Sequence, residues 1–239
     1  MILTSYTTDL FIIFVLTLVL LGTKAFLVIF LGKELYGKYK SLGYFEFDFL
    51  FAFFILMVCL LISRIFYVIF DFVLTQYTIE NYVEWAIFWK LAGFIGGIGL
   101  FFVLLTIERA VLNYKLKAIP SIIILLSFIV VLVFPVNEIS DFQLLHINII
   151  FSLSLIFIVP IIFIYMGIRA PEIRKVSFIL SLGVILFLVG LVFMNEFFLY
   201  QLNRITTFFL FILFKLSGLI LISYSATNLY IYNYFMEEK

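Results

Sequence analysis

Residues 85–107 read WAIFWKLAGFIGGIGLFFVLLTI, a run of 23 residues in which Lys90 is the one ionisable side chain. A transmembrane α-helix needs about 20 consecutive, mostly apolar residues to cross the hydrocarbon core of a bilayer. A strand of a membrane β-barrel would instead alternate apolar and polar residues over about ten positions. The run therefore predicts a membrane-spanning helix.

Similar apolar runs lie on both sides of this segment, separated by short polar connections. They predict an all-α, polytopic membrane bundle of seven transmembrane helices, with residues 1–239 forming a single transmembrane domain. The predicted spans are 10–31, 47–70, 85–107, 119–134, 144–166, 176–194 and 206–225.

The composition agrees with a lipid environment and excludes several classes of site. The chain is 66% hydrophobic and 12% charged, whereas a soluble domain is about 45–50% apolar and about 25% charged. The net charge of +1 gives no reason to expect a nucleic-acid partner. With one cysteine and one histidine, the chain can form neither an internal disulfide nor a multi-cysteine or histidine-cluster metal site.

The basic residues of the connections predict the orientation. Cytoplasmic loops of membrane proteins carry an excess of Lys and Arg. The first, third and fifth connections contain nine such residues. The second, fourth and sixth contain two, Arg204 and Lys90 if the latter is counted as juxtamembrane, and are otherwise acidic. We therefore expect the N-terminus to lie outside the cell and the C-terminus in the cytoplasm. We expect the protein to reside in the plasma membrane.

Three of the cations inside predicted spans stand out, because a charge there costs several kcal/mol and often marks function. We expect Arg64, Lys90 and Lys215 to lie at similar depth near the outer end, forming a pocket for a small polar or anionic ligand. Alternatively, each cation pairs with a carboxylate at the rim or extends to the interface. The acids that could partner them are Asp71, Glu84 and Glu196.

Lys215 also raises the question of a cofactor. A lysine in the seventh span, within FKLSGLILI (214–222), resembles the retinal-binding helix of microbial rhodopsins. A retinal Schiff base would need a buried carboxylate counter-ion, and the predicted spans offer none at mid-membrane. We therefore expect no cofactor.

A second group of charged residues is predicted to lie on the cytoplasmic side and to form a signalling face. Glu108 and Arg109 end the third span; the alternative for this pair is a helix cap followed by an arginine that obeys the positive-inside pattern. The connection after the fifth span adds Arg169, Glu172, Arg174 and Lys175.

Glycines at short spacing predict close helix packing. Gly93 and Gly97 form a G-x-x-x-G pair in the third span, and Gly183 and Gly190 are seven residues apart in the sixth. Small residues at such spacings let helix backbones approach closely in a membrane. Pro160 is expected to kink the fifth span.

Three strings carry a family resemblance: SRIFYVIFDF (63–72), LTIER (105–109) and RAPEIRK (169–175). They resemble a group of archaeal and bacterial seven-helix membrane proteins, some of which are similar to the sensor module that precedes histidine kinases. The resemblance implies a sensor or receptor-like role. Since no kinase domain follows the last predicted span, a signal would have to pass to a separate protein partner.

Two other functions stay open: a transporter or channel, and a structural subunit of a membrane complex. A homo-oligomer would fit each of them. The sequence contains no Walker, HExxH or GxSxG motif, so nothing in it indicates an enzyme.

Overall fold

Helices make up nearly all of the chain that this computed structural model describes, which is residues 2–44, 46–112, 114–193 and 204–237. Four short helical turns, three of them 3₁₀ and η1 a π-helix, join or extend the longer helices: η1 (Ile69–Leu74), η2 (Ile79–Asn81), η3 (Leu155–Phe157) and η4 (Pro171–Ile173). The α-helices are α1 (Ile2–Leu42), α2 (Phe49–Val68), α3 (Ala86–Ala110), α4 (Ile119–Val133), α5 (Ile139–Ser154), α6 (Ile158–Arg169), α7 (Arg174–Phe193) and α9 (Arg204–Glu237).

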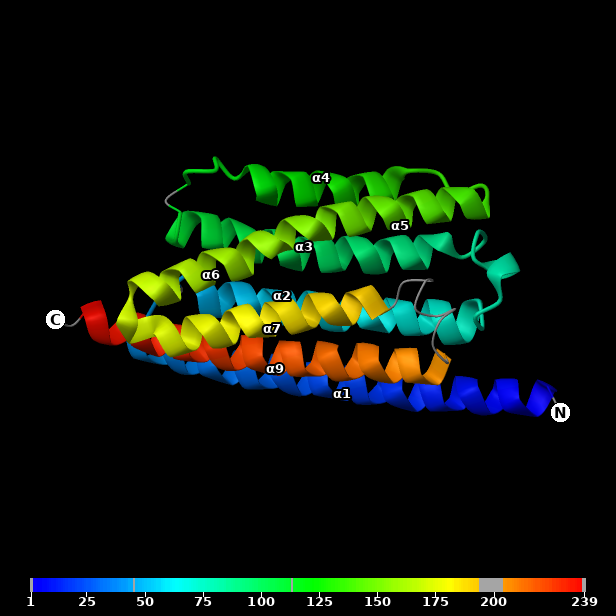
Figure 1. Cartoon of the computed structure of the whole chain (residues 1–239), viewed down its shortest axis with the longest axis horizontal. Coiled ribbons are helices and arrows are strands. Elements are labelled where there is room, and N and C mark those ends of the chain that lie inside the picture. Colours follow the sequence, from blue (N-terminus) through cyan, green and yellow to red (C-terminus); the bar gives the residue numbers. More distant parts are fainter. Residues whose placement is uncertain (1, 45, 113, 194–203, 238–239) are drawn as a thin grey trace. The chain divides into compact units, whose positions relative to one another are not determined.

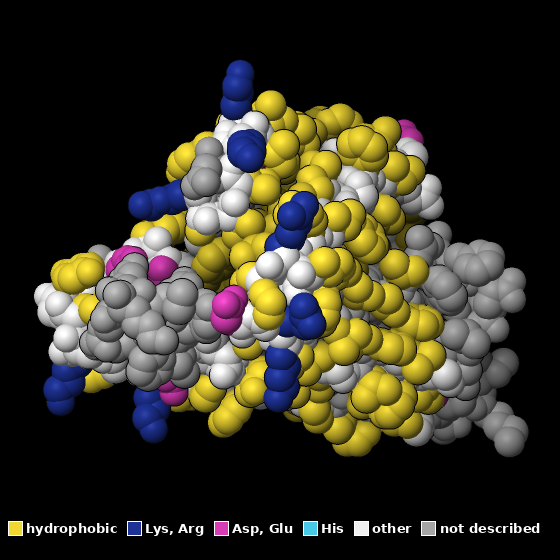
Figure 2. All heavy atoms as spheres, turned by 60° about the vertical axis from the view of Figure 1, so that its left-hand side comes forward, with side chains coloured by type: hydrophobic (Ala, Val, Ile, Leu, Met, Phe, Trp, Pro, Cys, Tyr) yellow, Lys and Arg dark blue, Asp and Glu magenta, His cyan; other side chains and the backbone are white. Residues whose placement is uncertain are grey.

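Six helical stretches of the described residues are long and apolar enough to cross a membrane, and much of the surface in Figure 2 is hydrophobic. The described residues of each predicted span are helical apart from a few at the ends, with the fifth span divided among α5, η3 and α6. The all-α prediction is therefore confirmed, and the apolar helices are compatible with a membrane bundle. The helix α4 is too short to cross a typical bilayer core by itself. Its 15 residues extend about 22 Å, whereas the hydrocarbon core is about 30 Å thick. The number of crossings and the orientation stay predictions.

The chain divides into two compact units. One is Val28–Val159, and the other combines Met1–Leu27 with Pro160–Lys239. In the first unit α2 packs on α3, α3 on α4 and α4 on α5, and Figure 1 shows these four helices running along a common axis. In the second unit α7 packs along α9.

Pro160 follows a local break in the helical path. The 3₁₀ turn η3 (Leu155–Phe157) separates α5 from α6, three to five residues before the proline. A proline has no N–H to donate and its ring clashes with the carbonyl four residues earlier, which here is that of Ile156. The turn is therefore the local consequence of the proline.

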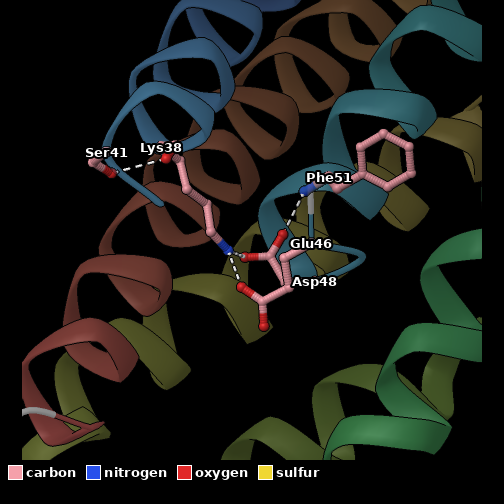
Figure 3. Close-up of polar contacts among 5 residues, drawn as sticks. All are labelled: Lys38, Ser41, Glu46, Asp48 and Phe51. Atoms are coloured by element: carbon pink, nitrogen blue, oxygen red, sulfur yellow. Dashed lines mark hydrogen bonds and ion pairs between the residues drawn. The ribbon is translucent and has the colours of Figure 1, made fainter. Parts of the chain in front are cut away.

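An ion-pair cluster fixes the turn between α1 and α2 (Figure 3). The Nζ atom of Lys38 lies 2.6 Å from Glu46 Oε2 and 2.7 Å from Asp48 Oδ2. The second carboxylate oxygen of Asp48 accepts a hydrogen bond from the Phe51 N–H at 3.0 Å, which caps α2. Lys38 is 6% exposed, so this lysine is a buried structural group. It lies on α1, which continues eleven residues beyond the predicted span 10–31.

Candidate functional site

A polar cluster on α2 surrounds Arg64, which is 5% exposed. Tyr67 lies one turn further along and is within electrostatic reach of both Arg64 and Asp71. Ser63, also buried, precedes the arginine. Arg64 and Asp71, two of the residues predicted for the pocket, thus both act electrostatically on a tyrosine that the sequence analysis did not single out.

Glycines of α3 provide the opposite wall of this cluster. A Cβ atom added to Gly93 would lie 3.8 Å from the Tyr67 hydroxyl oxygen, and one added to Gly96 would lie 3.5 Å from Ser63 Oγ. The hydroxyl groups of α2 therefore lie directly against the backbone of α3. We call Ser63, Arg64, Tyr67 and Asp71 the polar seam.

The end of the seam is a π-helix. The turn η1 (Ile69–Leu74) contains Asp71 and continues directly from α2. Thr75 ends it, donating from both its N–H (2.9 Å) and its Oγ (2.8 Å) to the carbonyl of Phe70. A π-turn shifts the residues that follow it out of the α-helical register, and such turns are frequent at functional sites. Asp71 lies within this turn, three residues beyond the end of α2.

Lys90, the second predicted pocket cation, has a different kind of partner. Its Nζ donates to the backbone carbonyl of Phe134, the C-cap residue of α4, rather than to a carboxylate at the rim. Lys90 is 7% exposed. A cation at the C-terminus of a helix interacts favourably with the helix dipole and satisfies a carbonyl that has no partner inside the helix.

Glu108 has the complementary role at the other end of α4. It is 2% exposed, and its Oε1 accepts hydrogen bonds from the N–H (3.1 Å) and the Oγ (2.6 Å) of Ser121. The N-cap residue of α4, Ala118, has no side-chain acceptor. Glu108 therefore caps the following helix rather than its own, and it is not part of an exposed signalling face.

Lys215 lies in the second unit, against aromatic rings. Its Nζ is 4.7 Å from the ring centroid of Phe211 and 5.4 Å from that of Phe187. A cation over an aromatic face is stabilised by the ring quadrupole, and more strongly where water is excluded. Arg64 and Lys90 belong to the other unit, so a pocket shared by all three cations stays a prediction.

The remaining predicted residues are mostly on the surface. Glu84 is exposed and Asp71 is half-buried, whereas Glu196 lies outside the described residues. Arg174 Nε donates to the Gly167 carbonyl at 3.1 Å, at the end of α6. Exposed side chains make up the rest of the predicted signalling face: Arg109, Arg169, Glu172 and Lys175.

The four predicted packing glycines do not all contact the same kind of neighbour. A Cβ on Gly97 would lie 2.3 Å from the ring of Phe128 on α4, whereas Gly93 faces Tyr67 on α2 and Ile149 on α5. In the second unit, a Cβ on Gly183 or Gly190 would lie 3.0 Å from backbone nitrogens of α9. The α7–α9 contact is therefore one of backbone against backbone.

Lys24 is a buried cation that the sequence analysis passed over. It is 2% exposed and lies within the predicted span 10–31. The signal was present, because a lysine inside an apolar run is by default a hypothesis of function. Lys24 belongs to the same unit as Lys215.

No protein-family profile, curated protein or solved structure matches this chain.

Proposed function

We propose that this protein is a membrane-embedded, sensor-like module that binds a small polar or anionic ligand at the polar seam. The observation that supports it is the burial of Arg64 on α2, one turn before Tyr67, on which both Arg64 and Asp71 of the adjoining π-turn act electrostatically. An arginine offers five donors in a planar fork, which suits carboxylate and phosphate groups.

The proposal includes the topology that the basic loops favour: seven crossings, the N-terminus outside and the seam opening outward. Ligand binding would change the position of Arg64 relative to Gly93 and Gly96, and so alter how α2 packs on α3. The exposed charges Arg109, Arg169, Glu172 and Lys175 would present that change to a cytoplasmic partner.

The test is native mass spectrometry of the full chain, purified in mild detergent from its own host. We expect a bound small molecule that is lost in Arg64→Met and weakened in Arg64→Lys, which keeps the charge but not the planar fork. Lys33→Met, which removes an exposed charge, is the control and should retain the ligand.

If Arg64→Met and the parent chain carry the same molecules, the seam is not the site. Reconstitution in liposomes distinguishes a sensor from a transporter. Flux of the bound molecule across the membrane would contradict the sensor proposal and identify a transporter or channel. Co-purification with a fixed set of other membrane proteins, with no small molecule bound, would favour a structural subunit.

A further inference from the structure

The connection between α3 and α4 carries basic side chains and no acidic residue. Arg109, Lys115 and Lys117 are all exposed, and no Asp or Glu occurs from Arg109 through Asn137. Glu108, the acid that precedes Arg109, is buried against Ser121, so the exposed charges from Arg109 to Lys117 are all positive. Figure 2 shows Lys and Arg side chains projecting from a largely hydrophobic surface.

Hydrogen bonds hold this connection in defined turns. The N–H of Tyr114 donates to the carbonyl of Glu108 at 2.9 Å, and the N–H of Lys117 donates to the carbonyl of Tyr114 at 2.8 Å. Tyr114, Lys117 and Ala118 have left-handed backbone conformations, with φ of 56°, 50° and 57°. Since Glu108 also caps α4 through Ser121, the basic connection is anchored to both helices.

An apolar face of α4 continues directly from these charges. Its residues follow the spacing i, i+3, i+4, i+7 of a single helix face, and about half of each side chain is exposed. They are Ile119 (53%), Ile122 (46%), Ile123 (40%) and Leu126 (55%).

We propose that the α3–α4 connection binds the headgroup of an anionic phospholipid whose acyl chains lie on the exposed face of α4. Arg109, Lys115 and Lys117 supply the charge for the phosphate, and the half-exposed Tyr114 has the amphipathic ring typical of a membrane interface. A basic cluster beside a membrane helix favours anionic lipids. The adjoining apolar face distinguishes a lipid from a soluble anion, which would need only the charges.

The experiment is a titration of the full chain in detergent with phosphatidylglycerol and with phosphatidylcholine of the same acyl chains, followed by native mass spectrometry. Phosphatidylglycerol should bind preferentially. The triple variant Arg109→Gln/Lys115→Gln/Lys117→Gln should weaken its binding by at least tenfold. The matched control Lys33→Gln/Lys40→Gln/Lys175→Gln removes three exposed charges elsewhere and should change it less than twofold.

Three results would overturn the proposal: equal loss in the two triple variants, equal binding of the two lipids, or displacement of phosphatidylglycerol by millimolar inorganic phosphate. If the triple variant does not fold, the single variants Lys115→Gln and Lys117→Gln replace it. Each should weaken phosphatidylglycerol binding about fivefold, and no change in either would also overturn the proposal.

Discussion

Lys90 and Glu108 hold opposite ends of the same helix. They are 18 residues apart on α3, about five helical turns, so both lie on the face that packs on α4. Lys90 donates to the carbonyl of Phe134 at the C-terminus of α4, and Glu108 accepts from Ser121 near its N-terminus. The signs match the helix dipole of α4 at both ends.

We predict that Lys90 and Glu108 each stabilise α4, and that substituting either residue lowers the free energy of unfolding. Glu108→Ala should lower the free energy of unfolding by about 1–3 kcal/mol, because it leaves the buried Ser121 N–H without an acceptor. Glu108→Gln keeps an acceptor oxygen and should cost less than half as much. Lys90→Met should cost a similar 1–3 kcal/mol, about the value of a hydrogen bond from a charged group. Thermal unfolding in detergent measures all three, and equal stability of Glu108→Ala and the parent chain would contradict the capping role.

A second prediction concerns Gly97. Gly97→Ala should destabilise the protein by at least about 1–3 kcal/mol, since the added Cβ would lie 2.3 Å from the Phe128 ring. Phe128→Ala in the same chain removes the ring atoms nearest to that Cβ, so Gly97→Ala should cost less in a Phe128→Ala background than in the parent chain. Gly22→Ala is the control, because a Cβ there meets nothing within 4 Å, and a helical Gly→Ala change is otherwise favourable by about 1 kcal/mol.

The α7–α9 contact gives a third prediction. Gly218→Ala should disrupt this helix pair, because the new Cβ would lie 2.6 Å from the Gly183 carbonyl oxygen and 2.6 Å from the Phe187 nitrogen. Backbone atoms cannot avoid the new Cβ by a change of rotamer, as a side chain can. No single side-chain truncation should therefore rescue the variant. Gly37→Ala, with nothing within 4 Å, is the matched control. Limited proteolysis and thermal unfolding would detect the difference, and identical profiles would argue against the tight contact.

The cluster around Lys38 yields a fourth prediction, based on the unequal roles of its two acids. Asp48 bonds both Lys38 and the Phe51 N–H. Glu46 bonds the lysine, no second bond joins it to the described residues, and its side chain is 48% exposed. Asp48→Ala should therefore cost about 1–3 kcal/mol of stability, and Glu46→Ala less than about 1 kcal/mol. Raising the salt concentration should affect the parent chain little, since Lys38 is buried. Equal losses in the two variants would show that the helix cap adds nothing.

The sequence was sufficient to locate the helices, because each requires a long apolar run that its own residues provide. It was less informative about the charges inside them. Their partners are set by contacts between helices: Lys90 bonds the end of α4, and Glu108 bonds a residue 13 positions later. The π-turn that contains Asp71 follows no pattern that the sequence analysis recognised. Lys24 could have been found from its position alone.

The shortness of α4 has a consequence for the membrane itself. In a chain that crosses a bilayer as we propose, a helix of about 22 Å with an exposed apolar face requires adjacent lipids to compress by roughly 8 Å. Such hydrophobic mismatch costs fractions of a kcal/mol per Å and sorts proteins among membranes of different thickness. The protein should therefore concentrate where acyl chains are short or loosely ordered. The length of α4 would then make its distribution depend on the thickness of the host membrane.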